Sequence, residues 1–402
     1  MTEKPDADIP LFPMSRPGPF ELPAEYARML EHCPVRRARL ANDTAVWLIS
    51  RYDDIRAALT DPRIRADRSA PGFPFLNAET THLRQVRVFF GMDSPDHGPA
   101  RHMYQTEFTA QRCEAMRPFL KHCVDERVDR LIAAGPPADV VRALAYPIPT
   151  LAVARVLGVP ESDYDGFERI ATATMTKRDE SHFAALFAYM RDLVDYRGRV
   201  PGNDLTSRVL RKHVKRGSIS TQDVLHTIFM IMTAGIETTA GLVSLGIATL
   251  LQHPDQLAEL RADPALMDGA VDELLRYLSV GELASVRIAG EDFTMRGVHI
   301  QAGEGIVALG AAGNRDPRTY PDPDTFDIHR DARRHLAFGH GPHKCIGWRL
   351  ARLELNIIFS TLIARLPELR LAGAITDDLL DNEALVFGLH ALDVTWRDGK
   401  QA

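Results

Sequence analysis

The sequence predicts a mainly α-helical protein with a minor β-rich part. Between about residues 80 and 280, apolar residues recur every three or four positions, which is the period of helices packed on a core. Alternation typical of strands occupies 286–309, and two further strand-like runs over 35–50 flank a turn at Asn42-Asp43, which predicts a hairpin. We therefore expect one large helical domain over 1–402, with β-rich parts at about 35–60 and 286–309 and a proline-rich segment at about 1–20.

Composition and charge narrow the class of protein. Of the 402 residues, 45% are hydrophobic and 25% are charged, a balance typical of a globular protein with a sizeable core. The net charge of −6 argues against nucleic acid as a partner. No run approaches the roughly 18 to 20 uninterrupted apolar residues of a membrane helix, and the acidic, proline-containing start differs from a signal peptide. The four cysteines lack framework spacing, which favours reduced thiols in the cytoplasm.

One predicted helix is long enough to cross the whole domain. Ser220 and Asp223 have the spacing of a capping box, and His253-Pro254 provides a stop. Its middle contains Gly235 and Glu237, although a glycine costs about 1 kcal/mol inside a helix and a buried carboxylate needs a partner. Two interpretations remain open: a kinked core helix with a satisfied acid, or a helix opened locally so that a hydroxyl, the acid and water face a cavity.

The glycine-rich segment Phe338-Gly339-His340-Gly341-Pro342-His343-Lys344-Cys345-Ile346-Gly347 is the strongest chemical signal. Glycines permit positive φ and close backbone approach. The helix expected after Cys345 directs backbone N–H groups toward its sulfur, which predicts a lowered thiol pKa. A flat macrocycle could lie against such a loop.

Three other interpretations of this segment remain open from the residues alone. Cys345 could be a buried structural cysteine, although that does not explain the glycines. His340, His343 and Cys345 could begin a zinc site, but no second ligand pair completes a tetrahedron. A catalytic Cys–His dyad is a third possibility, without an evident oxyanion hole or orienting acid.

The loop resembles the haem-binding signature Phe-x-x-Gly-x-x-x-Cys-x-Gly of the cytochrome P450 family. Four more motifs of that family occur in order: the segment from Asp93 to His97 followed by Arg101, Ala234–Thr238, Glu273-Leu274-Leu275-Arg276, and Phe326–Arg330. The likeness is to the soluble bacterial branch, especially the actinobacterial class I monooxygenases. Gly98 and Pro99 depart from the usual pattern of the first motif, from Asp93 to Arg101. They leave open how the helix expected there begins.

This resemblance implies the cytochrome P450 fold, with haem b (iron protoporphyrin IX) between the long helix and the cysteine loop with its following helix. Cys345 would ligate the iron. The other haem contacts implied are Ala234, Gly235, Phe338 and Gly339, with His97, Arg101, Arg287 and His343 at the propionates. Thr238 is similar to the residue that hydrogen-bonds the bound dioxygen, and Glu237 to the acid that relays protons. Glu273, Arg276 and Arg330 would be structural.

The resemblance also implies where the substrate binds. The expected pocket residues are Phe73, Phe75, Leu76, Met175, Phe229, Leu283, Val286, Val386 and Phe387. Because they are mostly apolar, we expect hydroxylation or epoxidation of a bulky, largely apolar molecule such as a secondary metabolite. Lys177 and Arg178 could meet a carboxylate, but a solvated face is the favoured interpretation.

Electrons must come from outside, because the chain leaves no room for a reductase domain. We expect a ferredoxin, served by a ferredoxin reductase and NAD(P)H, to dock on a basic face formed by Arg112, Lys344, Arg349 and Arg352. The family habit is monomeric. The alternative functions are those of a nitric oxide reductase-like enzyme and of a non-enzymatic haem binder, and the Glu237-Thr238 pair argues against both.

Overall fold

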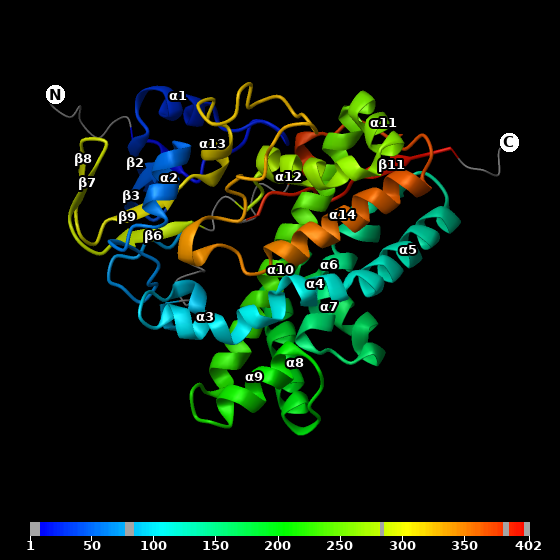
Figure 1. Cartoon of the computed structure of the whole chain (residues 1–402), viewed down its shortest axis with the longest axis horizontal. Coiled ribbons are helices and arrows are strands. Elements are labelled where there is room, and N and C mark those ends of the chain that lie inside the picture. Colours follow the sequence, from blue (N-terminus) through cyan, green and yellow to red (C-terminus); the bar gives the residue numbers. More distant parts are fainter. Residues whose placement is uncertain (1–8, 77–83, 282–284, 381–385, 398–402) are drawn as a thin grey trace.

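A single long helix organises the protein. The computed structural model describes residues 9–76, 84–281, 285–380 and 386–397, and in it α10 (Thr221–Gln252) runs through the centre of the helical part (Figure 1). The Ser220 hydroxyl accepts from the Asp223 backbone N–H, and the Asp223 carboxylate accepts from that of Ser220. The capping box and the end at His253 are therefore confirmed. The helix is apolar and long enough to cross a membrane, but 61% of its most apolar window is buried in the fold, as in a core helix.

The other helices pack around α10 or beside the sheet. Those of the helical part are α3 (His97–Gln105), α4 (Ala110–Ala115), α5 (Arg117–Ala134), α6 (Pro147–Leu157), α7 (Tyr164–Lys177), α8 (Glu180–Arg199), α9 (Leu205–Val209), α11 (Pro254–Ala262), α12 (Met267–Leu278) and α14 (Trp348–Arg365). The β-rich part carries α1 (Ala24–His32), α2 (Tyr52–Ala58) and α13 (Gly310–Asn314). Buried side chains of α5, α6, α8, α10, α12 and α14 form one continuous hydrophobic core. The mainly α-helical class is confirmed.

The main sheet has the order β1-β2-β3-β9-β6-β4. Its strands are β1 (Leu11–Phe12), β2 (Val35–Leu40), β3 (Ala45–Ile49), β4 (Ile64–Arg65), β6 (Val286–Ala289) and β9 (Gly305–Ala308). A second sheet joins β10 (Arg370–Leu371), β11 (Asp393–Thr395) and β5 (Ala138–Asp139), and β7 (Phe293–Met295) pairs with β8 (Val298–Ile300). β3 pairs in parallel with β9, so the sheet joins the two β-rich parts far apart in sequence.

The hairpin and the strands over 286–309 are found where predicted. The first β-rich part, predicted at about 35–60, is shorter than expected. Its strands end at Ile49, and α2 begins at Tyr52 with Asp53 and Asp54 in its first turn. Acidic residues in a first turn favour a helix, because they interact with its positive end. Tyr52 and Ile55 are buried against the sheet, so the apolar residues that suggested a strand form the inner face of a short helix.

Gly241 is the point where α10 meets the C-terminal segment. A Cβ built there would lie well inside van der Waals distance of the Phe387 carbonyl oxygen, a backbone atom that cannot rotate away. We expect Gly241→Ala to destabilise the protein by about 1–3 kcal/mol, which is typical of overpacking, and to lower the melting temperature. Gly198→Ala is the matched control: it lies in α8, where nothing stands within 4 Å, so alanine should stabilise the helix by about 1 kcal/mol. Equal melting temperatures for the two variants would contradict this account.

Candidate active site

The loop before α14 is held by its own backbone. The Cys345 N–H donates to the Phe338 carbonyl at 2.9 Å, and the Gly339 N–H donates to the Leu336 carbonyl at 2.8 Å. Gly339 and Gly341 have φ of +69° and +71°, values that favour glycine. A Cβ on Gly341 would also lie 2.5 Å from the Leu59 carbonyl oxygen. The glycines therefore fix the loop and bring it against the end of α2.

The Cys345 sulfur lies near the start of α14. Burial raises the pKa of the thiol, whereas backbone N–H groups of Gly347 and Trp348 and the cations Arg101 and Lys344 act in the opposite direction. The predicted lowering of this pKa is therefore wrong for the chain by itself, because desolvation outweighs the helix terminus. Cys345 is exposed in this structure, whereas Cys113 and Cys123 are buried. Cys345 is therefore not packed like a structural cysteine.

A group of buried basic side chains adjoins this loop. Arg101 donates to the Lys344 carbonyl at 2.6 Å, and the rings of His97 and His343 lie 4.1 Å apart. His343 approaches the Asp93 carboxylate at 3.8 Å. Burial, then the charges of His343 and Arg101, lower the pKa of His97 to about 4, and burial lowers that of Arg287 to about 10. Arg287, His97 and His343 thus share Asp93 as a nearby carboxylate.

Sequence reasoning missed one member of this basic group. The Arg68 Nη1 atom is buried without a hydrogen-bond partner within the described residues, and burial lowers the pKa of Arg68. Its positive charge also acts on Arg287. Gly91 makes room for it, because a Cβ there would lie 2.9 Å from the Arg68 side chain. No motif in the sequence marks Arg68; only the three-dimensional grouping does.

α10 stays helical throughout, so the interpretation of a locally opened helix is wrong. The Thr238 hydroxyl donates to the Ala234 carbonyl at 2.6 Å, one turn back, and so adds a bond to the helix instead of breaking one. Ala234 is nevertheless exposed, and Gly235 and Thr238 are partly exposed, in a helix otherwise largely buried. These residues therefore border internal space.

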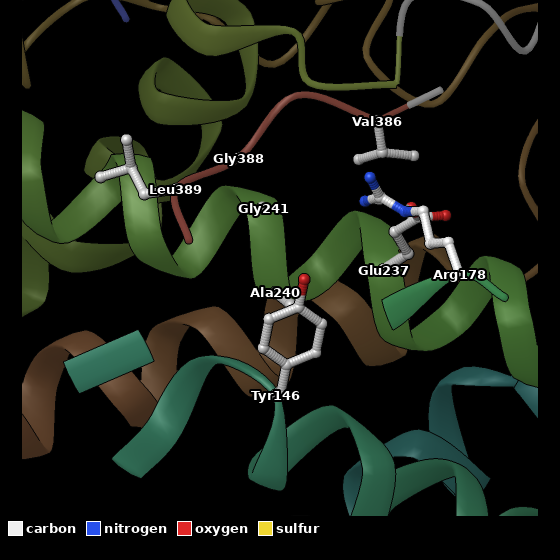
Figure 2. A pocket seen from close by; sticks show the side chains of 8 residues that line it. All are labelled: Tyr146, Arg178, Glu237, Ala240, Gly241, Val386, Gly388 and Leu389. Carbon is white, nitrogen blue, oxygen red and sulfur yellow. Dashed lines mark hydrogen bonds and ion pairs between the residues drawn. The ribbon is translucent and has the colours of Figure 1, made fainter. Parts of the chain in front are cut away.

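Glu237 is partnered by a residue that was expected to be solvated. Arg178 caps the C-terminus of α7 with φ +51°, and its guanidinium lies 3.3 Å from the Glu237 carboxylate. The solvated face expected for Arg178 is therefore wrong. Figure 2 shows the pair beside a cavity that is also lined by Tyr146, Gly241 and Val386. Its volume of about 10 Å³ is roughly that needed by one water molecule.

Comparisons with known proteins place this site in a family. A profile described as "Cytochrome P450" matches residues 173–367. The chain is 38% identical over 395 residues to the vitamin D3 dihydroxylase of Streptomyces griseolus, covering 97% of each chain. It is 40% identical over 404 residues to cytochrome P450 GfsF of Streptomyces halstedii, covering 98% of this chain and 97% of that one.

Solved structures agree with this placement. The crystal structure of GfsF superposes with a TM-score of 0.91, covering 96% of this chain and all (100%) of the other. That of MycCI, the mycinamicin VIII C21 methyl hydroxylase of Micromonospora griseorubida, gives 0.89 at 35% identity, with coverage of 96% and 100%. The chain belongs to the cytochrome P450 family.

As a cytochrome P450 monooxygenase the protein uses haem, and the residues present fit that group. Haem carries two anionic propionates, which need cations or hydrogen-bond donors. The basic group beside the loop offers both. Arg287 is a buried cation, and His97 Nε2 is buried without a hydrogen-bond partner among the described residues. Cys345 would supply the soft ligand typical of this iron.

In this P450 the three residues expected to be structural lie together. Arg276 makes two bonds to the Glu273 carboxylate, at 2.6 and 2.7 Å, and Arg330 adds a third at 3.2 Å. The side chains of Glu273 and Arg276 are completely buried. Arg276 also donates to the carbonyls of Asn314 and Pro323, so the network ties α12 to the irregular segment before the cysteine loop.

The expected substrate residues of the P450 are distributed over several places. The tilted rings of Phe73 and Phe75 lie 5.0 Å apart, centroid to centroid, in a small cluster with Ile288, where Val286 also packs. Leu76 packs against a separate cluster formed by buried residues of β2, β3 and β9. Met175 is buried in the main core. Phe229 contacts the Phe187 ring at 5.4 Å.

The expected substrate residues near the C-terminus, Val386 and Phe387, also lie in different surroundings. Val386 borders the Glu237 cavity, and the Phe387 ring lies 4.3 Å below the Arg16 guanidinium. Leu283 lies outside the described residues. The structure therefore does not bring these nine residues into one cavity within its described part.

Proposed function

We propose that this P450 monooxygenase hydroxylates or epoxidises a bulky, largely apolar secondary metabolite in the cytoplasm, with electrons from a ferredoxin. The proposal is supported by the apolar character of Phe73, Phe75 and Phe229, and by relatives named for vitamin D3 and mycinamicin VIII. The observation that carries it is the accessibility of Ala234, Gly235 and Thr238 in the middle of a helix that is otherwise largely buried. A single domain over 1–402 is part of this proposal.

When bound, haem supplies the chemistry of dioxygen activation, and the chain supplies ligation, neutralisation and protons. Cys345 would hold the iron, with Ala234, Gly235, Phe338 and Gly339 bordering the macrocycle. Arg101 and Arg287 would neutralise the propionates, His97 and His343 would donate hydrogen bonds to them, and Arg68 would join this set. Thr238 would direct its hydroxyl toward the distal side, where Glu237, held by Arg178, would take up and release protons.

The role of Thr238 gives the test of this function. In Thr238→Ala we expect product per electron consumed to fall about tenfold or more, with hydrogen peroxide taking its place, because proton delivery of this kind typically contributes about 10²–10⁴-fold. Product, peroxide and NAD(P)H oxidation are measured together. Thr249→Ala is the matched control, since its hydroxyl makes the same bond one turn back, 2.8 Å to Leu245, in a buried part of α10. Tight coupling in Thr238→Ala would refute the assigned role.

Charge reversal tests whether a ferredoxin docks on the expected basic face. Of the four expected cations, Arg112 pairs with Glu107 at 3.2 Å and Arg352 with Asp272 at 2.7 Å. We expect the double variant Lys344→Glu/Arg349→Glu to slow ferredoxin-dependent reduction about tenfold or more at low salt, and the loss to shrink as ionic strength rises. Stopped-flow reduction under carbon monoxide measures it.

The same change of charge on the β-rich side, Arg28→Glu/Arg39→Glu, serves as the control for that experiment. Both side chains are exposed there. An equal effect of the two double variants would mean that net charge, and not this face, governs reduction.

A further inference from the structure

Arg16 joins the start of the chain to the end of α12. It is only 6% exposed, although it belongs to a segment without regular secondary structure before α1. Its guanidinium donates from Nη1 to the Leu278 carbonyl at 3.0 Å and from Nη2 to the Ser279 carbonyl at 3.2 Å. These carbonyls lie at the C-terminal, negative end of α12, where a cation is favourable. The helix end therefore holds the guanidinium in one place.

The same guanidinium supports an aromatic ring from the other end of the chain. It lies 4.3 Å from the centre of the Phe387 ring, a distance at which a cation and an aromatic face attract each other. The Phe387 backbone N–H donates to the Val280 carbonyl at 3.0 Å, just beyond the end of α12. Phe387 is thus held twice at this junction, by its ring on Arg16 and by its backbone on the segment that leaves α12.

Phe387 belongs to a short segment, residues 386–389, that packs on the middle of α10. We call this segment the 386–389 wall. Three of its residues line the small cavity beside Glu237 (Figure 2). At its far end the Leu389 N–H donates to the Ser244 hydroxyl at 3.2 Å. Backbone contacts with α10 therefore hold the end of the wall, and Arg16 holds its largest side chain.

The 386–389 wall lies next to the part of α10 that would carry the chemistry. Glu237 borders the cavity that the wall closes, Thr238 follows it directly, and Ala234 and Gly235 are accessible less than one turn earlier. A shift of the wall would change the space for an organic molecule beside these residues. A misplacement of about 1 Å, even from a distant substitution, can cost about 100-fold in rate. The position of the wall therefore matters for function.

We propose that Arg16 is a positioning residue for substrate selection, which holds the 386–389 wall in place through Phe387 and the end of α12. The inference rests on the proposed monooxygenase site and deepens it by a residue from the first segment of the chain. Arg16 touches neither haem nor substrate in this role. Without its guanidinium the wall adopts several positions, and a bulky molecule has to order the wall when it binds.

Two azoles that bind the ferric haem iron test the wall without turnover. Imidazole is small and reaches the iron alone, whereas clotrimazole carries three aryl rings beside its imidazole. In Arg16→Met we expect the Kd of clotrimazole, measured from the shift of the Soret band, to rise about tenfold, because the wall must then be ordered on binding. The Kd of imidazole should stay the same. An unchanged Kd of clotrimazole, or an equal rise for both azoles, would overturn the inference.

Arg315→Met is the matched control for loss of a buried arginine at this helix end. Arg315 is also 6% exposed, donates to the Tyr277 carbonyl at 2.9 Å and lies 4.0 Å from the centre of the Tyr277 ring. It contacts Phe20 and Asp324 in place of the wall. Both variants should lower the melting temperature, but only Arg16→Met should raise the Kd of clotrimazole. An equal rise in both would mean general loosening around α12 and would overturn the inference.

A double-mutant cycle tests whether Arg16 acts through the Phe387 ring. Phe387→Leu removes the aromatic face and keeps the backbone bond to Val280, so adding Arg16→Met to it should change the Kd of clotrimazole far less than in the wild-type background. The same rise in both backgrounds would overturn the assigned role. Such a failure leaves the proposed function standing, since that function is judged separately by electron coupling in Thr238→Ala.

Discussion

Replacing Cys345 with alanine is expected to abolish the strongly red-shifted Soret band of the reduced, carbon monoxide-treated protein. The band requires a thiolate on the iron, and the other three cysteines occupy other places in the fold. Cys33 follows α1 and packs beside the sheet, whereas burial raises the pKa of Cys113 and of Cys123 to about 11 in the hydrophobic core. Cys345, by contrast, is exposed beside the basic group that would take the propionates.

The matched control for this spectrum is Cys113→Ala, which removes a thiol buried in the hydrophobic core and should leave the band intact. Cys345→Ala should also reduce the haem retained after gel filtration. The haem would then be held by the basic group at its propionates but no longer by a bond to its iron. Persistence of the red-shifted band in Cys345→Ala would refute ligation by this residue.

The second large effect is expected from Arg276→Ala. Removal of the Arg276 guanidinium leaves the Glu273 carboxylate fully buried, with Arg330 as its remaining cation. Breaking a buried ion pair in this way costs about 3–5 kcal/mol of folding free energy. The carbonyls of Asn314 and Pro323 lose their donor too. We expect a large fall in melting temperature and poor haem incorporation, measured by calorimetry and by the ratio of Soret to protein absorbance.

Two further variants separate charge from packing in this network. Arg330→Ala should cost clearly less, because Glu273 keeps both bonds from Arg276. The double variant Glu273→Leu/Arg276→Met removes both buried charges together and should be more stable than Arg276→Ala, since an apolar pair of similar size avoids the desolvation penalty. A double variant less stable than the single one would show that the carbonyl bonds, and not the stranded carboxylate, dominate.

The parts of the fold that local chemistry determines were predictable from the sequence. The two ends of α10 follow from a capping box and a His-Pro stop, and the hairpin from its turn residues. The first β-rich part was predicted too long, because a short run with buried Tyr52 and Ile55 has no clear period. The Glu273–Arg276 bond is also local, one helical turn apart.

The features of the site that the sequence did not predict depend on contacts between segments far apart in the chain. Arg178 lies 59 residues from Glu237, so no spacing reveals their pairing. Arg68 joins the basic group only because the chain folds back over Gly91. The thiol pKa of Cys345 moves opposite to the expected direction because burial, which no local pattern measures, exceeds the effect of the helix terminus.

The basic group beside the cysteine loop has a consequence for the production of this protein in cells. Without an anionic cofactor, the cations Arg287 and Arg68 repel each other, and Arg68 Nη1 and His97 Nε2 are buried with no hydrogen-bond partner among the described residues. Both effects oppose closure of the fold. Bound haem would therefore act as a counter-ion for folding as well as in catalysis. Chains synthesised faster than the host makes haem will stay open to proteases and aggregation, so the yield of mature enzyme will follow the supply of the porphyrin precursor more closely than the strength of the promoter.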